Sequence, residues 1–457
     1  MNRREFIGGA ALTAAAARTG VAQSGKKPNF LFVMGDDMTW TDSGESGSKQ
    51  VRTPNIDRLR QEGMRFTRCF TPTAMCSPMR QSIYTGLFPV RSGAYPNHAV
   101  VRAGTKSVVH YLGDLGYAVG ISGKRHFGPP ASFPFTKLGD EIDFPKIEGF
   151  LKENSQKPFA LFVCSNEPHS PWNRGDRSAY PAEAITVPPY LVDTPEMRDT
   201  MSRYFAEITY LDGQLGRTLD LLHASGQDQN TVVIFSSEQG SSFAHCKWTL
   251  YDTGVRSELI ARWPGHIAAG STSSAMIQHV DLLPTWIELA GGKPPASLDG
   301  KSFAAALAGK TQKHRDVVFG IHTTRGIIDG SESYPIRSVR DERYKFIWNL
   351  NYKEKFSNIV TKRGGEHFQS WREAAKANPD AAEKVRAYEY RPEEELYDLE
   401  TDPWEMKNIA ADPAQTARRT RMKARLRQWM EQQGDHGLET EMEALEHQNP
   451  NPAERKG

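Results

Sequence analysis

Five short segments of the chain are almost continuously apolar. They are residues 29–34, 117–121, 159–163, 231–235 and 259–263. Runs of this length without polar alternation are typical of strands that are buried on both faces, as in a parallel sheet. The pattern therefore predicts a sheet with both faces covered.

Helical patterns lie between these segments, at residues 54–62, 78–84, 106–115 and 196–222. In the longest one, apolar side chains such as Met197, Met201 and Tyr204 recur at spacings of three and four, which indicates a face packed on the core. Because strands and helices alternate, the first 300 residues are expected to form an α/β sandwich.

The pattern changes after Pro294-Pro295 and the segment 300–309. Short alternating runs at 317–321, 336–340 and 344–348 predict a small antiparallel sheet, and a later helix carries Met422, Leu426, Trp429 and Met430 on one face. The basic run 418–427 is interpreted as the solvated side of that helix, with a docking surface for an anionic polymer as the alternative. We expect a catalytic domain over 25–310, a C-terminal subdomain over 311–434 and a polar tail with little order over 435–457.

The N-terminus combines Arg3-Arg4 with a small apolar run over residues 8–17. This combination resembles a twin-arginine export signal over residues 1–24, which predicts an exported protein, periplasmic or extracellular. A disordered or tag-like start is the alternative. The run is shorter than the roughly 20 residues that a spanning helix needs, so no membrane span is expected.

The overall composition adds little to this picture. The 457 residues are 38% hydrophobic with a net charge of +2, as in an ordinary globular protein, and no basic stripe points to nucleic acid. The four cysteines are too few and too scattered for a disulfide framework, and none forms a CxxC pair.

Polar residues follow four of the predicted strands. They are Asp36-Asp37, Lys124 with His126, His169, and Glu238-Gln239. Ligands of open α/β sheets bind beyond the carboxyl ends of the strands, so these groups are expected to meet in one crevice.

The chemistry of these residues is mutually consistent. Three carboxylates and an amide, on Asp36, Asp37, Glu238 and Gln239, offer the hard oxygen ligands that calcium or magnesium prefers, whereas zinc would require His or Cys. Lysines and histidines beside them suit a tetrahedral oxyanion. A single Asp pair is more often a cap and a lone His more often structural, but four such groups at four strand ends favour a site.

The segment Cys76-Ser77-Pro78-Met79-Arg80 carries the motif Cys-x-Pro-x-Arg. With this motif, residues 29–410 resemble the formylglycine-dependent (type I) sulfatases of the alkaline-phosphatase-like superfamily. The alternative for Cys76 is a buried free cysteine at a helix start. The resemblance implies a mostly parallel or mixed sheet between helices, followed by a smaller α+β domain built on an antiparallel sheet.

The same resemblance implies that Cys76 is oxidised to formylglycine by a formylglycine-generating enzyme or an anaerobic maturase. The hydrated aldehyde has two hydroxyls, of which one attacks sulfur and the other expels sulfate. Asp36, Asp37, Glu238 and Gln239 would hold calcium, or alternatively magnesium, together with the modified Cys76. The family usually has Asp followed by Asn or His where this chain has the longer Glu238-Gln239, which indicates a remodelled metal site.

Further roles also follow only from the resemblance. Arg80 would hold the formylglycine, Lys124 and His126 would bind and deprotonate its hydroxyls, and His169 and Lys247 would grip the sulfate and protonate the leaving atom. His98 and His322 are expected near the rim, where they would contact the sugar; surface histidines without a role are the alternative.

Segments 123–129, 133–135, 333–339 and 349–352 look like the N-sulfoglucosamine sulfohydrolase branch of the family. This resemblance implies a sulfated carbohydrate substrate, N-sulfoglucosamine of heparin or heparan sulfate. Three alternatives remain, which are an O-sulfatase acting on 6-sulfated glucosamine or an algal polysaccharide, a phosphodiester or phosphonate hydrolase, and an inactive glycan-binding homologue.

Overall fold

A computed structural model describes residues 26–44, 47–362 and 366–449. All five apolar runs are strands of one eight-stranded sheet with the order β10-β2-β9-β7-β1-β6-β4-β5. The five are β1 (Asn29–Gly35), β4 (Ala118–Gly123), β6 (Phe159–Cys164), β7 (Thr231–Ser237) and β9 (Leu259–Arg262). Its other strands are β2 (Met64–Phe66), β5 (Thr136–Lys137) and β10 (Ser271–Ser273). The export signal predicted for residues 1–24 lies outside the described residues.

The centre of the sheet is parallel, as predicted. Leu31 of β1 is in register with Leu161 of β6 and with Val233 of β7. The parallel prediction is wrong for β9, which runs antiparallel to β7 and β2. An apolar run indicates that a strand is buried on both faces, but it does not indicate the direction in which the strand runs. The connection from β7 to β9 contains only α7 (Asp252–Val255) and β8 (Arg256–Ser257), and it lacks the crossover helix that parallel neighbours need.

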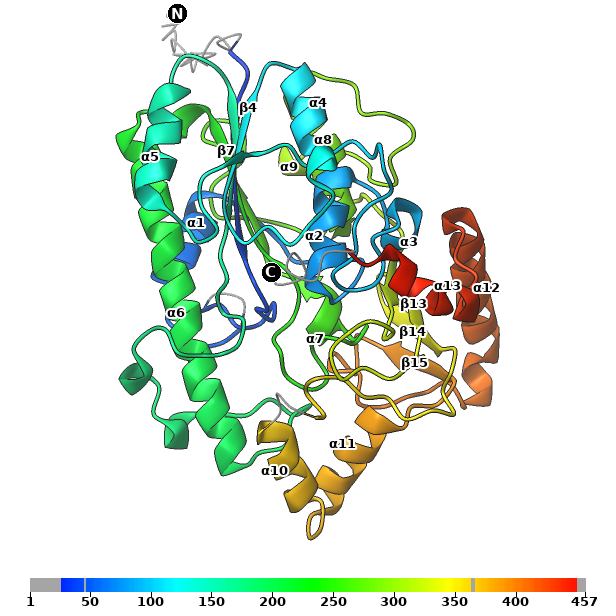
Figure 1. The fold of residues 1–457 in the computed structure, drawn as a ribbon. Coiled ribbons are helices and arrows are strands. Elements are labelled where there is room, and N and C mark those ends of the chain that lie inside the picture. Colours follow the sequence, from blue (N-terminus) through cyan, green and yellow to red (C-terminus); the bar gives the residue numbers. More distant parts are fainter. Residues whose placement is uncertain (1–25, 45–46, 363–365, 450–457) are drawn as a thin grey trace, which may run out of the picture.

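Helices cover both faces of the sheet (Figure 1). One layer contains α1 (Pro54–Glu62), α5 (Phe144–Glu153) and α6 (Pro195–Ala224), and their apolar side chains share a core with Leu31 and Val33. The other contains α2 (Cys76–Thr85), α4 (Val108–Asp114), α8 (Leu282–Leu289) and α9 (Ala304–Leu307), which pack with Phe30 and Phe32. Alternate residues of one strand thus face opposite layers, which confirms the predicted α/β sandwich.

A second sheet follows the sandwich. It is antiparallel and consists of β12 (Val318–His322), β13 (Ile336–Arg340), β14 (Tyr344–Asn349) and β15 (Glu394–Asp398). Between β14 and β15 the chain forms α10 (Glu366–Ala374) and α11 (Pro379–Glu389). The predicted apolar face of α12 (Thr416–Gln433) packs on a core with Val339 and Phe346 of the sheet. A further short sheet joins β11 (Ile277–Gln278), β3 (Cys69–Phe70) and β8.

Residues 435–449 differ from the expected polar tail. They contain α13 (Leu438–Met442) and a 3-10 turn over Ala444–His447. Asp435 and Arg337 form a fully buried ion pair, and the buried Glu441 accepts hydrogen bonds from Thr324 and Arg325. The polar composition suggested little order, but these carboxylates are ordered because they pair with buried donors. In Figure 1 this segment (red) returns from α12 toward α3 (Pro89–Ser92) and α2.

None of the helices in the described parts of the chain combines the length and the apolar character that crossing a membrane requires.

Candidate active site

Cys76 is the first residue of α2 and is almost completely buried, with 3% of its surface exposed. Its Sγ lies 3.1 Å from Nε2 of Gln239 and 3.7 Å from Oδ1 of Asp36. Burial, followed by the charge of Glu238, raises the pKa of the Cys76 thiol to about 12. At neutral pH the thiol is therefore protonated, and an unmodified Cys76 is a poor thiolate nucleophile.

The predicted convergence of the strand ends is present. Asp36 and Asp37 follow β1, and Nζ of Lys124, just after β4, donates to Oδ2 of Asp36 at 2.6 Å. Nζ of Lys247 donates to Oδ2 of Asp37 at 2.7 Å, and Nε2 of His169 lies 3.6 Å from the same oxygen. Two carboxylates from one strand end thus gather two lysines and a histidine from three other segments.

Arg80 lies one turn after Cys76 on α2 and is completely buried. Its guanidinium forms an ion pair with Glu238, donates from Nη1 to the carbonyl oxygen of Lys124 at 2.9 Å and lies 3.7 Å from Oδ2 of Asp36. Arg80 therefore holds the ends of β1, β4 and β7 against the start of α2, which fixes where Cys76 sits.

The pKa values of the site's carboxyl groups are shifted in opposite directions. Burial by itself would raise the pKa of Asp36, but the charges of Lys124, His169 and Arg80 outweigh it and hold that pKa well below its ordinary value. Asp37 is buried as well, and Lys247 and His169 likewise lower its pKa. For Glu238, burial dominates and raises the pKa to about 7.

Two buried oxygens of the site have no hydrogen-bond partner among the described residues, Oε1 of Glu238 and Oε1 of Gln239. An unpartnered buried acceptor is costly, and a cation would satisfy both. Ligand atoms of Asp36, Cys76 and Glu238 also lie within 4.8 Å of one another. The set is rich in hard oxygens, so these residues fit calcium or magnesium despite the longer side chains at 238 and 239.

His126 and His98 form a pair beside this cluster. Nε2 of His126 lies 2.9 Å from Nδ1 of His98, within hydrogen-bond distance. Burial, with the charge of Lys124, lowers the pKa of His126 well below its ordinary value, so its ring is neutral. Asp37, His98 and His126 all have positive φ angles, of 64°, 60° and 50°. Left-handed backbone at non-glycine residues is strained and gathers at functional sites.

His322 does not lie where it was expected. It is completely buried, neither ring nitrogen has a hydrogen-bond partner in the part of the chain described, and its ring centre is 6.4 Å from that of Trp248. The prediction of a rim position is therefore wrong, because His322 ends β12 inside the second sheet's packing. Ser242 was missed; its Oγ donates to Oδ2 of Asp37 at 2.5 Å. Its place three residues after Gln239, in the same strand-end loop, was an available signal.

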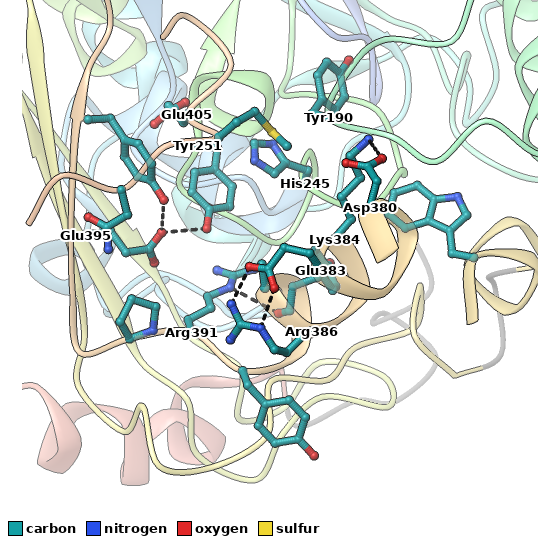
Figure 2. A pocket seen from close by; sticks show the side chains of 18 residues that line it. Tyr190, His245, Tyr251, Asp380, Glu383, Lys384, Arg386, Arg391, Glu395 and Glu405 are labelled. Carbon is teal, nitrogen blue, oxygen red and sulfur yellow. Dashed lines mark hydrogen bonds and ion pairs between the residues drawn. The ribbon is translucent and has the colours of Figure 1, made fainter. Parts of the chain in front are cut away.

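A cavity of about 620 Å³ lies between segment 245–251 and the residues of α11 and β15 (Figure 2). Tyr190, His245 and Tyr251 line one part of it, and Arg386 and Arg391 line another. None of the predicted site residues lines this cavity. The candidate active site is therefore identified by the convergence of charged side chains and not by the size of a cavity.

Two family models match the chain. The model described as "Sulfatase" matches residues 28–140 and 128–292, and the one described as "N-sulphoglucosamine sulphohydrolase, C-terminal" matches residues 244–364. The first spans most of the α/β sandwich, and the second runs from the Lys247 loop through β12, β13 and β14.

Characterised relatives point the same way. An ulvan-active sulfatase of Formosa agariphila is 34% identical over 90% of this chain and 81% of its own length. The human N-sulphoglucosamine sulphohydrolase is 27% identical over 84% of this chain and 86% of its own. Among solved structures, a protein in complex with its substrate D-glucosamine-2-N,6-O-disulfate has a TM-score of 0.69 at 21% identity, covering 90% of this chain and 99% of the other. That structural match confirms the fold.

Proposed function

The chain belongs to the sulfatase family, and from that premise we propose that it removes sulfate from N-sulfoglucosamine units of heparin or heparan sulfate, with formylglycine made from Cys76 and bound calcium. Hydrolysis of sulfate esters or sulfamates on sulfated glycans is the activity of the family. The substrate, the modification and the metal are the proposed parts.

One observation carries the proposal. Cys76 is buried and protonated, yet it lies at the start of α2 beside a cluster of carboxylates with two unpartnered oxygens. A protonated thiol in such a place is unsuited to direct attack, whereas a modified side chain at 76 and a cation facing Glu238 and Gln239 would use every group present.

The residues around Cys76 supply the remaining chemistry. Asp36, Asp37, Glu238 and Gln239 would hold calcium, which would polarise sulfate oxygens, and formylglycine would supply a hydroxyl nucleophile. Lys124, which contacts Asp36, and the neutral ring of His126, two residues further along the chain, suit a hydroxyl that loses its proton. Lys247 and His169, which both face Asp37, suit the sulfate oxygens and the proton that the leaving nitrogen or oxygen needs.

The C-terminal family match supports the N-sulfated substrate, because the model that matches residues 244–364 is described as "N-sulphoglucosamine sulphohydrolase, C-terminal". A second candidate is an O-sulfatase of an algal polysaccharide, which the 34% identity to the ulvan-active sulfatase favours. Both candidates use the same residues around Cys76 and differ in the sugar that is presented to them.

The test measures sulfate release from N-sulfated glucosamine, 6-O-sulfated glucosamine and ulvan fragments, in parallel with hydrolysis of a phosphodiester. Calcium is present, and conversion of Cys76 is established by peptide mass. We expect release from the N-sulfated sugar and none from Cys76→Ala. Release from an ester substrate alone would move the assignment to an O-sulfatase. A phosphodiester as the only substrate, or no turnover by the converted protein, would overturn the proposal.

We also propose export through the twin-arginine signal over residues 1–24, after modification of Cys76 by a maturase of the host. Replacement of Arg3-Arg4 by Lys-Lys is expected to leave the protein in the cytoplasm of the producing cell. Equal amounts of both forms in the periplasmic fraction would contradict this route.

A further inference from the structure

The ring of His126 contacts the ring of His98. Nε2 of His126 is occupied by the contact with Nδ1 of His98 at 2.9 Å, while Nδ1 of His126 is buried without a hydrogen-bond partner among the described residues. His98 itself holds a left-handed backbone conformation, which is uncommon outside glycine and is kept where the surrounding structure fixes it. Something outside this pair must therefore hold the 97–99 loop.

The C-terminal segment makes those contacts. The backbone N–H of Asn449 donates to the carbonyl oxygen of His98 at 2.9 Å. Nε2 of Gln448 donates to the carbonyl oxygen of Asn97 at 2.9 Å, and Gln448 also forms a β-bridge with Ala99. Residues on both sides of His98 are thus held by a segment some 350 positions away in the sequence.

The same segment reaches a second loop. Nε2 of Gln448 also donates to the carbonyl oxygen of Gly326 at 2.8 Å. Oε1 of Glu441 accepts hydrogen bonds from the backbone N–H groups of Thr324 and Arg325, at 2.9 and 2.8 Å. A Cβ at Gly326, where φ is +94°, would come within 2.5 Å of the Gln448 amide. One amide group therefore ties loop 324–326 to loop 97–99.

Loop 97–99 also contacts α2, the helix that begins at Cys76. Oδ1 of Asn97 accepts from the backbone N–H of Ser77 at 3.4 Å, and the carbonyl oxygen of Ala99 accepts from Ser77 Oγ at 3.2 Å and from Gln81 Nε2 at 2.8 Å. A shift of the 97–99 loop would therefore change both the His98–His126 contact and the packing of the first turn of α2.

We propose that residues 441–449 act as a clamp that positions His98 and, through it, the ring of His126, with Gln448 as the positioning residue. The role in catalysis rests on the proposed function, in which His126 faces the modified side chain at 76. In this arrangement His98 is an orienting residue for His126, in addition to any contact with the sugar.

The decisive variant is Gln448→Glu, which keeps the side chain's size but replaces the donating amide by oxygens that face two carbonyls. We expect kcat to fall about 10- to 100-fold with KM changed less than threefold, because geometry and not sugar binding is disturbed. Gln428→Glu, on the exposed side of α12, is the matched control and is expected to behave as the parent.

Two readouts do not depend on turnover. Amide hydrogen exchange over residues 97–101 is expected to speed up in Gln448→Glu, and the ring ¹⁵N shifts of His98 and His126, assigned with His98→Gln and His126→Gln, are expected to change. Unchanged exchange and ring shifts would overturn the clamp, as would a loosened loop with unchanged kcat. A parent enzyme without any sulfate release would refute the proposed function, and the spectra would still decide whether the clamp positions His126.

Discussion

At the scale of single residues, Glu238 is the group on which we expect metal binding to depend. Its Oε1 is buried and unpartnered, and its carboxylate also neutralises Arg80. Replacement by glutamine removes one charged ligand, so we expect Glu238→Gln to weaken calcium binding by at least about tenfold in titration calorimetry. Glu207→Gln, a buried carboxylate that caps the backbone N–H groups of Asn173 and Arg174, is the control. Equal affinities in all three proteins would show that calcium binds elsewhere.

His279 makes a separate prediction about acid stability. It is completely buried, its Nε2 contacts Ser236 Oγ at 2.9 Å, and burial lowers its pKa to about 3. Because the folded pKa lies below the unfolded one of about 6.5, its stabilising contribution is complete above pH 6.5 and is lost as the pH falls toward 3. Between pH 7 and pH 5 the parent should lose roughly 2 kcal/mol of unfolding free energy that His279→Gln does not lose.

Denaturant unfolding of both proteins at the two pH values measures this difference. The other buried histidines are common to parent and variant, so their protonation cancels in the comparison. A pH dependence that is the same in the two proteins would mean that His279 does not stay neutral in the folded state.

At the scale of elements, the turn after β7 sets the position of Glu238 and Gln239. A Cβ at Gly240 would lie 1.8 Å from the backbone carbonyl oxygen of Thr253, and the Gly240 N–H donates to the Gly254 oxygen at 2.9 Å. Gly240→Ala must therefore displace this turn, so we expect a loss of about 2 kcal/mol or more in unfolding free energy and weaker calcium binding. Gly213→Ala on α6, where a Cβ meets nothing within 4 Å, should instead stabilise by roughly 0.5–1 kcal/mol.

Thermal unfolding and calcium titration of the two glycine variants provide the comparison. If Gly240→Ala matched the parent in both, the close approach of the β7 turn to Thr253 would not be needed for the site.

Elements were predictable from the sequence where local patterns determine them. The apolar runs placed five strands to within one or two residues, and α1 has the predicted bounds because Pro54 starts it and Gly63 follows it. The direction of β9 was not predictable, since it depends on a connection without a crossover helix. The order in residues 438–449 was also missed, because its polar side chains find partners, such as Asn97 and Gly326, that are distant in sequence.

At the scale of the whole molecule, the candidate site was also predictable only in part. Asp36, Lys124 and Glu238 could be grouped in advance, because the carboxyl ends of parallel strands meet at one edge. The same rule could have predicted Ser242, which lies in the loop after β7. The burial of His322 and the contacts of Gln448 with Asn97 and of Asn449 with His98 join segments that are far apart in the sequence, so no local pattern predicts them.

A buried ion cluster connects the two units that we propose over residues 25–310 and 311–434. Nζ of Lys345, on β14, lies 2.5 Å from Oδ1 of Asp252 on α7 and 2.9 Å from Oε1 of Glu405, and the Lys345 side chain is 1% exposed. Lys345→Met would leave two buried carboxylates, with the charges of Arg340 and Arg256 near Asp252. We expect the unfolding free energy to fall by about 3–5 kcal/mol, because an uncompensated buried charge is costly.

Denaturant unfolding followed by fluorescence and by circular dichroism tests this, with the exposed Lys376→Met as control. Since the cluster spans both units, one transition should move as a whole in Lys345→Met, with coincident signals from the two probes. Two transitions of which only one moves would mean that the sandwich and the second sheet are stable independently. In that case the clamp over residues 441–449 could loosen while the part of the sandwich around Cys76 stayed folded.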